Sequence, residues 1–168
     1  MTAQPLIRRL CVIGVGLIGG SLARALRERG EVAEVVGAGR HEENLRAAVR
    51  LGVVDRYDTD PVRAVIGADM VVVAVPLGAI EAVLRAIVPR LSPDAVVTDV
   101  GSAKGSVVAD VERVYGQIPP NFVPGHPIAG TEKSGVEASF STLFQRRRVI
   151  LTPLAETAAF AHQLVKRM

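Results

Sequence analysis

A glycine-rich turn near the start of the chain constrains the fold more than any other feature. Residues 10 to 13 have the length and apolar character of a buried strand, and Gly14, Gly16 and Gly19 follow at G-x-G-x-x-G spacing. Apolar residues then recur at helical spacing up to position 26. A strand, a glycine turn and a helix in this order are the setting in which the motif binds the pyrophosphate of a dinucleotide.

Each glycine of the motif has its own physical reason. Gly14 permits the tight turn, Gly16 lets the backbone approach the pyrophosphate, and Gly19 lets helix and strand pack closely. The pyrophosphate would lie on free N–H groups at the start of the helix, so Leu17 and Ile18 are counted among the cofactor-binding residues. The alternative is a glycine-rich turn that arose by chance.

The motif predicts an α/β fold, a doubly wound and mostly parallel sheet of the Rossmann type with helices on both faces. We expect residues 1–168 to form one dinucleotide-binding domain. The apolar pattern predicts strands at 8–13, 34–38, 70–76, 95–99, 121–124 and 149–151. Helices are expected at 17–29, 42–51, 79–90, from 104 onward and at 155–167, while residues 55–61 read as a polar loop.

Composition supports this class and excludes others. A chain of 168 residues with 49% hydrophobic and 4% aromatic residues suits one α/β core. The only basic cluster, residues 146–148, lacks interleaved aromatics, so we expect no nucleic-acid partner. No apolar stretch has the length of a membrane span, and the single Cys11 permits a reducing, cytoplasmic location. The acids of residues 55–60 are irregularly spaced and lack a companion His or Cys, so no metal site is expected.

The residue that follows the second strand bears on the choice of cofactor. In NAD-binding folds an acid roughly 20 positions beyond the last glycine of the motif bonds the ribose 2′-hydroxyl. Counting from Gly19 reaches Gly39, and Arg40 comes next. A guanidinium suits a phosphate, so NADP is favoured and NAD is possible. Under the alternative, Arg40 is only a solvated side chain and NAD binds through other contacts.

The carboxyl ends of three further strands carry the remaining candidates. In open α/β sheets ligands bind beyond these ends, so Pro76 and Leu77 should border the cofactor. Ser102 follows the next strand, where it could also simply cap a helix. His126 lies in a loop bounded by glycine and proline, and it suits a proton acceptor because imidazole titrates near neutral pH.

Four segments together resemble one known family. They read GVGLIGGSLA at 14–23, VAVPL at 73–77, TDVGSAKG at 98–105 and GHPIAGTEKSGVEAS at 125–139. They are similar to the prephenate/arogenate (cyclohexadienyl) dehydrogenases of tyrosine biosynthesis. The resemblance implies oxidative decarboxylation of prephenate to 4-hydroxyphenylpyruvate, or of arogenate to tyrosine, with hydride transfer to NAD or NADP.

The same resemblance implies roles for single residues. His126 matches the histidine that accepts a hydrogen bond or proton from the ring 4-hydroxyl, and Ser102 matches the serine that orients it and touches the same hydroxyl. Glu132 and Lys133 match positions at the substrate entrance, with Thr131 beside them.

The family pattern continues into a helical domain that forms the homodimer and supplies an arginine for a substrate carboxylate. We expect that domain to be absent from residues 1–168, which makes this chain the cofactor-binding portion and leaves its turnover alone in question.

Two other functions fit part of the pattern. Another Rossmann-fold reductase, of the β-hydroxyacid or imino-acid type, would share the glycine motif but should lack the His126 loop. A non-catalytic nucleotide-binding module is favoured by the expected absence of the substrate domain, but it would need neither Ser102 nor His126, and the presence of both argues against it.

Overall fold

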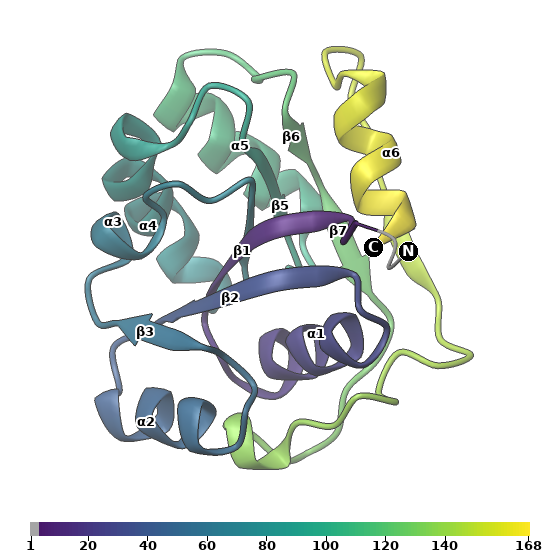
Figure 1. Cartoon of the computed structure of the whole chain (residues 1–168). Coiled ribbons are helices and arrows are strands. Elements are labelled where there is room, and N and C mark those ends of the chain that lie inside the picture. The colour runs from purple at the N-terminus through teal and green to yellow at the C-terminus, as the bar shows by residue number, and fades with distance from the viewer. Residues whose placement is uncertain (1–3) are drawn as a thin grey trace.

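The glycine turn follows the central strand of a six-stranded parallel sheet (Figure 1). A computed structural model describes residues 4–168, and the strands lie in the order β3-β2-β1-β4-β5-β6. Their bounds are β1 (Ile7–Ile13), β2 (Val32–Ala38), β3 (Arg56–Asp58), β4 (Met70–Val73), β5 (Val96–Asp99) and β6 (Phe122–Val123). This strand order, which reverses beside β1, confirms the predicted doubly wound fold.

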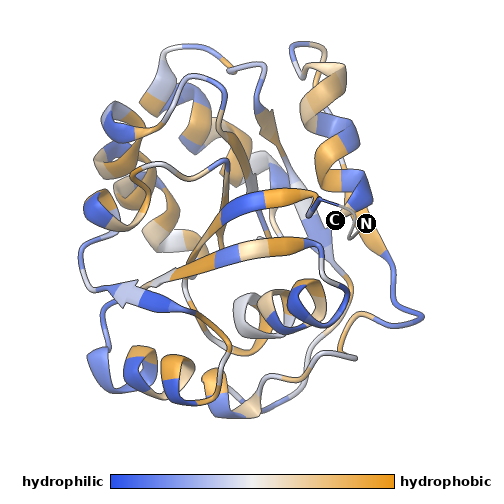
Figure 2. Ribbon diagram, in the orientation of Figure 1, coloured by the Kyte–Doolittle hydropathy of each residue, from blue (hydrophilic) through white to orange (hydrophobic). Residues whose placement is uncertain are grey.

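Helices cover both faces of the sheet. They are α1 (Leu17–Glu28), α2 (Glu42–Arg50), α3 (Pro61–Ala64), α4 (Ile80–Ile87), α5 (Lys104–Tyr115) and α6 (Ala159–Arg167). Short 3₁₀ turns are η1 (Leu77–Ala79), η2 (Val88–Arg90) and η3 (Val136–Ala138). Apolar residues lie on the strands and on the helix faces toward them, and hydrophilic residues on the outer faces (Figure 2). None of the helices in residues 4–168 has the length and apolar character needed to cross a membrane.

The two faces of the sheet form two separate cores because strand side chains alternate. Leu10 and Val12 of β1 pack under α1, α2 and α6. Cys11 and Ile13 face the opposite way, under α3, α4 and α5. Burial raises the pKa of the Cys11 thiol to about 12, so this cysteine is an inert packing residue.

The prediction of a polar loop over residues 55–61 is wrong in part. Residues 56–58 form β3, a three-residue edge strand paired with β2. Its charged residues concealed it, since an edge strand of this length needs little apolar surface. The acids there have structural partners: Asp58 pairs with Arg63, and Asp60 accepts a hydrogen bond from Val62 N at 2.9 Å as the cap of α3.

The C-terminal helix begins later than predicted, at Ala159 instead of residue 155. The preceding residues form a turn from Leu154 to Thr157, which bonds to the β6 region hold in place. Thr157 Oγ1 accepts from Leu154 N (2.9 Å) and donates to Phe122 O (3.2 Å), and Ala158 N donates to Pro120 O (2.7 Å). Similarly, the helix predicted at 79–90 is α4 flanked by η1 and η2, and β4 ends at Val73, before Pro76.

A second, two-stranded sheet was not predicted. Residues 125–127, expected to be loop, form β7 (Gly125–Pro127), which pairs antiparallel with β8 (Val149–Leu151). The strand predicted at 149–151 is therefore confirmed, but it belongs to this ribbon and not to the main sheet. The ribbon places His126 in a regular strand.

Truncation of Phe122 should test the thin edge of the sheet. Phe122 is 1% exposed, so Phe122→Ala should lower the free energy of unfolding by about 3–5 kcal/mol. Phe160 is 57% exposed, and Phe160→Ala should change the free energy of unfolding by less than about 0.5 kcal/mol. Urea denaturation of both variants measures the difference. Equal losses would show that β6 is not part of the cooperative core.

Candidate functional site

The glycine turn lies between the ends of β2 and β4, the two strands that flank β1. Gly14 has a left-handed φ of +96°, and a Cβ there would collide with the carbonyl oxygen of Ala74, just beyond β4. Its N–H donates to Ala38 O, at the end of β2, over 2.8 Å. Only glycine combines this left-handed φ with the absence of a Cβ.

Gly19 and Gly16 differ in their surroundings. A Cβ at Gly19 would meet Gly14 O and would lie 2.8 Å from Val12 Cγ1, so this glycine brings α1 against β1. At Gly16 a Cβ would meet nothing within 4 Å. The turn and packing roles predicted for Gly14 and Gly19 are thus confirmed, while the approach of a ligand at Gly16 stays a prediction.

The start of α1 is suited to an anion. Gly20 N donates to Gly16 O at 2.9 Å, so the N–H groups of Leu17, Ile18 and Gly19 are not used by the helix. Among residues 4–168 no side chain caps this end, and the first turn holds no acid. Free N–H groups and the positive end of the helix dipole therefore face the space beside Gly16, as a pyrophosphate requires.

Arg40 lies two residues beyond the end of β2 and is exposed. Within residues 4–168 it forms no salt bridge. The nearby Glu42 is engaged elsewhere, since it accepts hydrogen bonds from Tyr57 (2.8 Å) and Arg46 (3.2 Å), which together lower its pKa. No acid thus occupies the place of the ribose-binding carboxylate, and a cation stands free beside it.

Pro76 and Leu77 follow β4 and lie next to the segment that carries Ser102. Pro76 is exposed at the N-cap of η1, and a Cβ at Gly101 would lie 2.8 Å from Leu77 Cδ2. Ser102 itself is exposed. The residue that caps α5 is Ala103, so the alternative interpretation of Ser102 as a helix cap is wrong.

Asp99, at the end of β5, organises the residues around His126. Its buried carboxylate accepts hydrogen bonds from Gly101 N (2.8 Å) and Gly125 N (3.1 Å). Lys104 forms a salt bridge with it and donates to Gly125 O at 2.6 Å. Desolvation lowers the pKa of Lys104 although Asp99 opposes the shift. The network fixes the start of β7 to the end of β5.

Sequence reasoning gave Asp99 and Lys104 no role. A signal was available: an aspartate that ends an otherwise apolar, buried strand needs a cation or donors near it. Lys104 stands five positions later, at the start of the predicted helix.

The structure brings His126 to the same edge of the sheet as the glycine turn. His126 is half-buried, lies opposite Ile150 in the ribbon and follows Gly125, which Asp99 holds. The ends of β1 and β5 are two strands apart, or about 10 Å. Within the described residues no hydrogen bond joins His126 to Ser102.

Thr131, Glu132 and Lys133 are exposed on the loop after β7. Thr131 Oγ1 accepts from Lys133 N at 3.1 Å, which closes a local turn. No hydrogen bond links these three residues to His126 or Ser102 in the part of the chain that the structure describes. Their position at a substrate entrance therefore stays a prediction.

The far end of this loop is fastened to the dinucleotide side. Asn44 of α2 donates to Val15 O (2.7 Å), inside the glycine turn, and accepts from Val136 N (3.0 Å). Ser21 of α1 accepts from Phe140 N at 3.0 Å. One amide side chain thus holds both the turn and the segment after the loop, a role that the sequence did not indicate.

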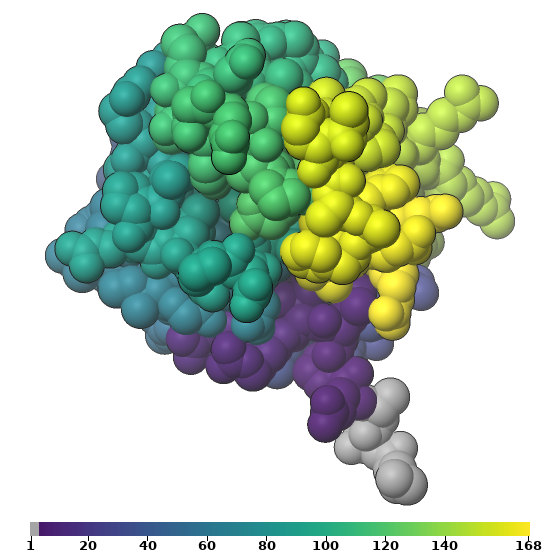
Figure 3. Space-filling model, turned by 90° about the horizontal axis from the view of Figure 1, so that it is seen from above, coloured from purple at the N-terminus to yellow at the C-terminus, as the bar shows by residue number. Residues whose placement is uncertain are grey.

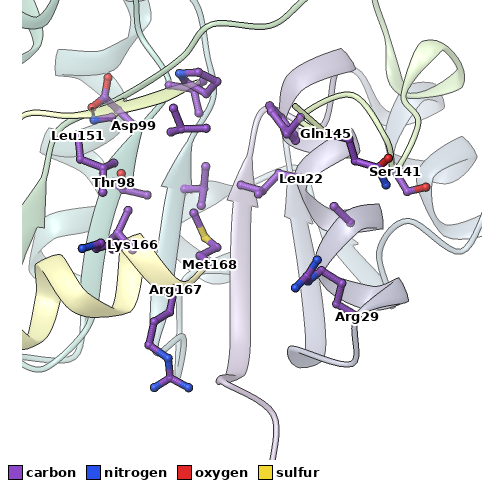
Figure 4. A pocket seen from close by; sticks show the side chains of 18 of the residues that line it. Leu22, Arg29, Thr98, Asp99, Ser141, Gln145, Leu151, Lys166, Arg167 and Met168 are labelled. Atoms are coloured by element: carbon purple, nitrogen blue, oxygen red, sulfur yellow. Dashed lines mark hydrogen bonds between the residues drawn. The ribbon is translucent and has the colours of Figure 1, made fainter. Parts of the chain in front are cut away.

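A cavity of about 420 Å³ lies between α1 and α6 (Figure 4), and Asp99 and Gly125 form part of its lining. Leu22, Arg29, Leu151 and Met168 are among the residues around it. It follows α1 toward its C-terminal end, at Arg29, so it is distinct from the space at Gly16. From above, α6 packs against the body while the segment before β8 stands out beside it (Figure 3). No group of three or more His, Cys, Asp or Glu that could hold a metal occurs in residues 4–168.

Residues 22–168 match the family model described as the prephenate dehydrogenase, nucleotide-binding domain. The chain belongs to this family. Cyclohexadienyl dehydrogenase of Zymomonas mobilis is 38% identical over 156 residues, which cover 92% of this chain and 52% of that protein. Prephenate dehydrogenase of Bacillus subtilis is 33% identical over 162 residues, covering 95% and 43%. The chain thus spans about half the length of the curated relatives it matches.

Solved structures agree. Prephenate dehydrogenase from A. aeolicus in complex with hydroxyphenyl propionate and NAD⁺ superposes with a TM-score of 0.87 at 38% identity, over 95% of this chain and 55% of that one. Synechocystis arogenate dehydrogenase gives a TM-score of 0.85 at 31% identity, over 95% and 55%. A diketoreductase at 18% identity shares the fold alone.

Two glycine variants should separate ligand approach from packing. Gly16→Ala fills open space, so it should leave the midpoint of thermal unfolding almost unchanged and weaken NADH binding at least tenfold. Gly19→Ala collides with Gly14 O, so it should lower that midpoint. Calorimetry and fluorescence titration measure the two effects. If Gly16→Ala binds NADH as wild type does, the pyrophosphate does not lie there.

Proposed function

We propose that this chain is the cofactor-binding portion of a dehydrogenase that oxidatively decarboxylates prephenate or arogenate, with hydride transfer to NAD(P). The observation that carries the proposal is the anchoring of His126, through Gly125 and Asp99, at the sheet edge that also holds the glycine turn. The names of the relatives and the NAD⁺ in the A. aeolicus complex support it.

The residues present suit this chemistry. A nicotinamide bound at the sheet edge supplies the hydride acceptor. As the ring carbon bearing the hydroxyl loses hydride, that hydroxyl becomes strongly acidic, and a neutral His126 accepts its hydrogen bond or proton. The electron pair of the bond to the ring carboxylate then enters the ring, carbon dioxide leaves, and an aromatic phenol forms once its oxygen keeps or regains the proton.

Ser102 supports His126 in this proposal. It lies between two anchors, Gly101 on Asp99 and Lys104 on Gly125, and its exposed hydroxyl is free to reach the substrate hydroxyl. Thr131, Glu132 and Lys133 line the entrance on their exposed loop. Pro76 and Leu77 border the nicotinamide side of the cofactor.

The proposal extends to a second domain and to a cellular location. A helical half, as in the resemblance, would supply the homodimer contact and the remaining substrate contacts. The reaction would take place in the cytoplasm, since the one cysteine is buried in the core and no disulfide is required.

Replacement of His126 tests the reaction. His126→Asn should lower the rate of prephenate- or arogenate-dependent cofactor reduction about 10²- to 10⁴-fold, because a general base is lost, and should change the Kd for NADH less than twofold. His162→Asn, on α6, is the matched control. NMR of the His126 imidazole with NAD⁺ and hydroxyphenyl propionate gives a readout that needs no turnover. Binding of NADH with neither turnover nor a change at the imidazole would indicate a nucleotide-binding module instead.

Arg40 supports a preference for NADP, with NAD also accepted. Arg40→Ala should weaken NADPH binding roughly tenfold, since a charge-assisted contact to the 2′-phosphate is lost. NADH binding should change little, as it lacks that phosphate. Fluorescence titration of wild type and variant with both cofactors measures the difference, and equal weakening of the two would refute the assignment.

A further inference from the structure

The ribbon of β7 and β8 has two unlike faces. Gly125, Pro127, Val149 and Leu151 line the cavity between α1 and α6. Side chains alternate along a strand, and directly opposed residues share a face. His126 and Ile150, which are opposed, therefore lie on the other face, away from that cavity.

The ladder continues by one pair beyond the strands. Ile128 N donates to Arg148 O at 2.8 Å, so Ile128 and Arg148 are opposed and share the face of His126. Ile128 is 44% exposed and Ile150 is 46% exposed, large fractions for isoleucines in a paired ribbon. An imidazole, an apolar surface and a guanidinium thus lie side by side on one face.

The chain reaches Arg148 through a specific turn. Arg147 N donates to Phe144 O at 3.0 Å, and Arg146 adopts a left-handed φ of +59°, which is unfavourable for any residue but glycine. This turn delivers Arg148 directly into the ladder. Arg148 is exposed and forms no salt bridge with any acid in residues 4–168, whereas Arg63, for example, pairs with Asp58 at 2.7 Å.

We propose that Ile128, Arg148 and Ile150 form, with His126, a subsite for a carbocyclic hydroxy acid. The ring hydroxyl meets His126, the ring lies on Ile150, and a carboxylate of the substrate pairs with Arg148. The inference rests on the proposed function and deepens it, because it assigns a substrate carboxylate to a residue of this chain.

The dimensions of the ribbon fit such a ligand. Diagonal neighbours across an antiparallel pair, such as His126 and Arg148, are about 7–8 Å apart. A six-membered ring with a hydroxyl at one end and a carboxylate-bearing group at the other is of this length. Arginine binds carboxylates through two parallel N–H donors, which also fixes the orientation of the ring.

The substrate's charge makes a second cation useful. Prephenate and arogenate each carry two carboxylates, and the family resemblance places one arginine outside this chain. Only the ring carboxylate leaves as carbon dioxide. Arg148 would hold the carboxylate of the side chain, which keeps its charge throughout the reaction.

The test uses the full chain saturated with NAD⁺ and two probes, hydroxyphenyl propionate and its neutral amide. Calorimetry should show that Arg148→Ala weakens the acid at least tenfold and changes binding of the amide less than twofold. Arg147→Ala removes the same charge from the neighbouring position, outside the His126 face, and should change either Kd less than twofold. Arg148→Lys should retain part of the affinity for the acid.

Other outcomes separate this subsite from the proposed function. Equal losses for acid and amide, or equal losses in Arg147→Ala and Arg148→Ala, would overturn the subsite while wild-type binding of the acid still supports the dehydrogenase. If wild type binds NADH but neither probe, the subsite is overturned while the proposed cofactor-binding role stands; if wild type binds no NADH, the proposed function fails and the subsite with it. Ile150→Ala should weaken both probes alike, and acid-only weakening there would contradict the placement of the ring.

Discussion

The buried contact between Asp99 and Lys104 holds together the segments that carry Ser102 and His126. Strand β5 ends at Asp99, and the segments that bring His126 into place, including β6, come after it in the chain. One carboxylate binds the N–H groups of Gly101 and Gly125, and one ammonium balances its charge and bonds Gly125 O. A buried charge pair contributes little net stability, because desolvation offsets much of the attraction. Its value here is geometric, since it joins the ribbon to the sheet.

A second fastening serves the dinucleotide side. The glycine turn is packed against Ala74 and bonded to Ala38, and Asn44 ties it to Val136, after the loop that follows β7. The exposed loop of residues 128–134 is thus held at both ends, by the ribbon and by Asn44. Loop residues positioned by a rigid scaffold in this way are common carriers of binding and specificity.

Sequence reasoning reached the main sheet because its signals are local. Apolar runs, helical periodicity and three glycines define β1, α1, β2, β4 and β5 without knowledge of their neighbours. It failed at β3 and β7, which are three residues long and contain charged, glycine or proline residues. Such strands exist because a partner is already in place, β2 for β3 and β8 for β7. Pairing across 20 or more residues leaves no trace in a local pattern.

The glycine motif also shows how late a dinucleotide site is completed. The carbonyl of Ala74 occupies the space that a side chain at Gly14 would take, and Ala74 N donates to Ile13 O at 2.7 Å. The two strands that flank β1 are β2, which ends at Ala38, and β4, which ends at Val73, so a chain that has emerged only as far as β3 contains the motif without the segment of Ala74 beside it. The nucleotide site is therefore complete only when β4 has paired with β1. Cofactor binding would then stabilise the folded sheet and not its isolated first half.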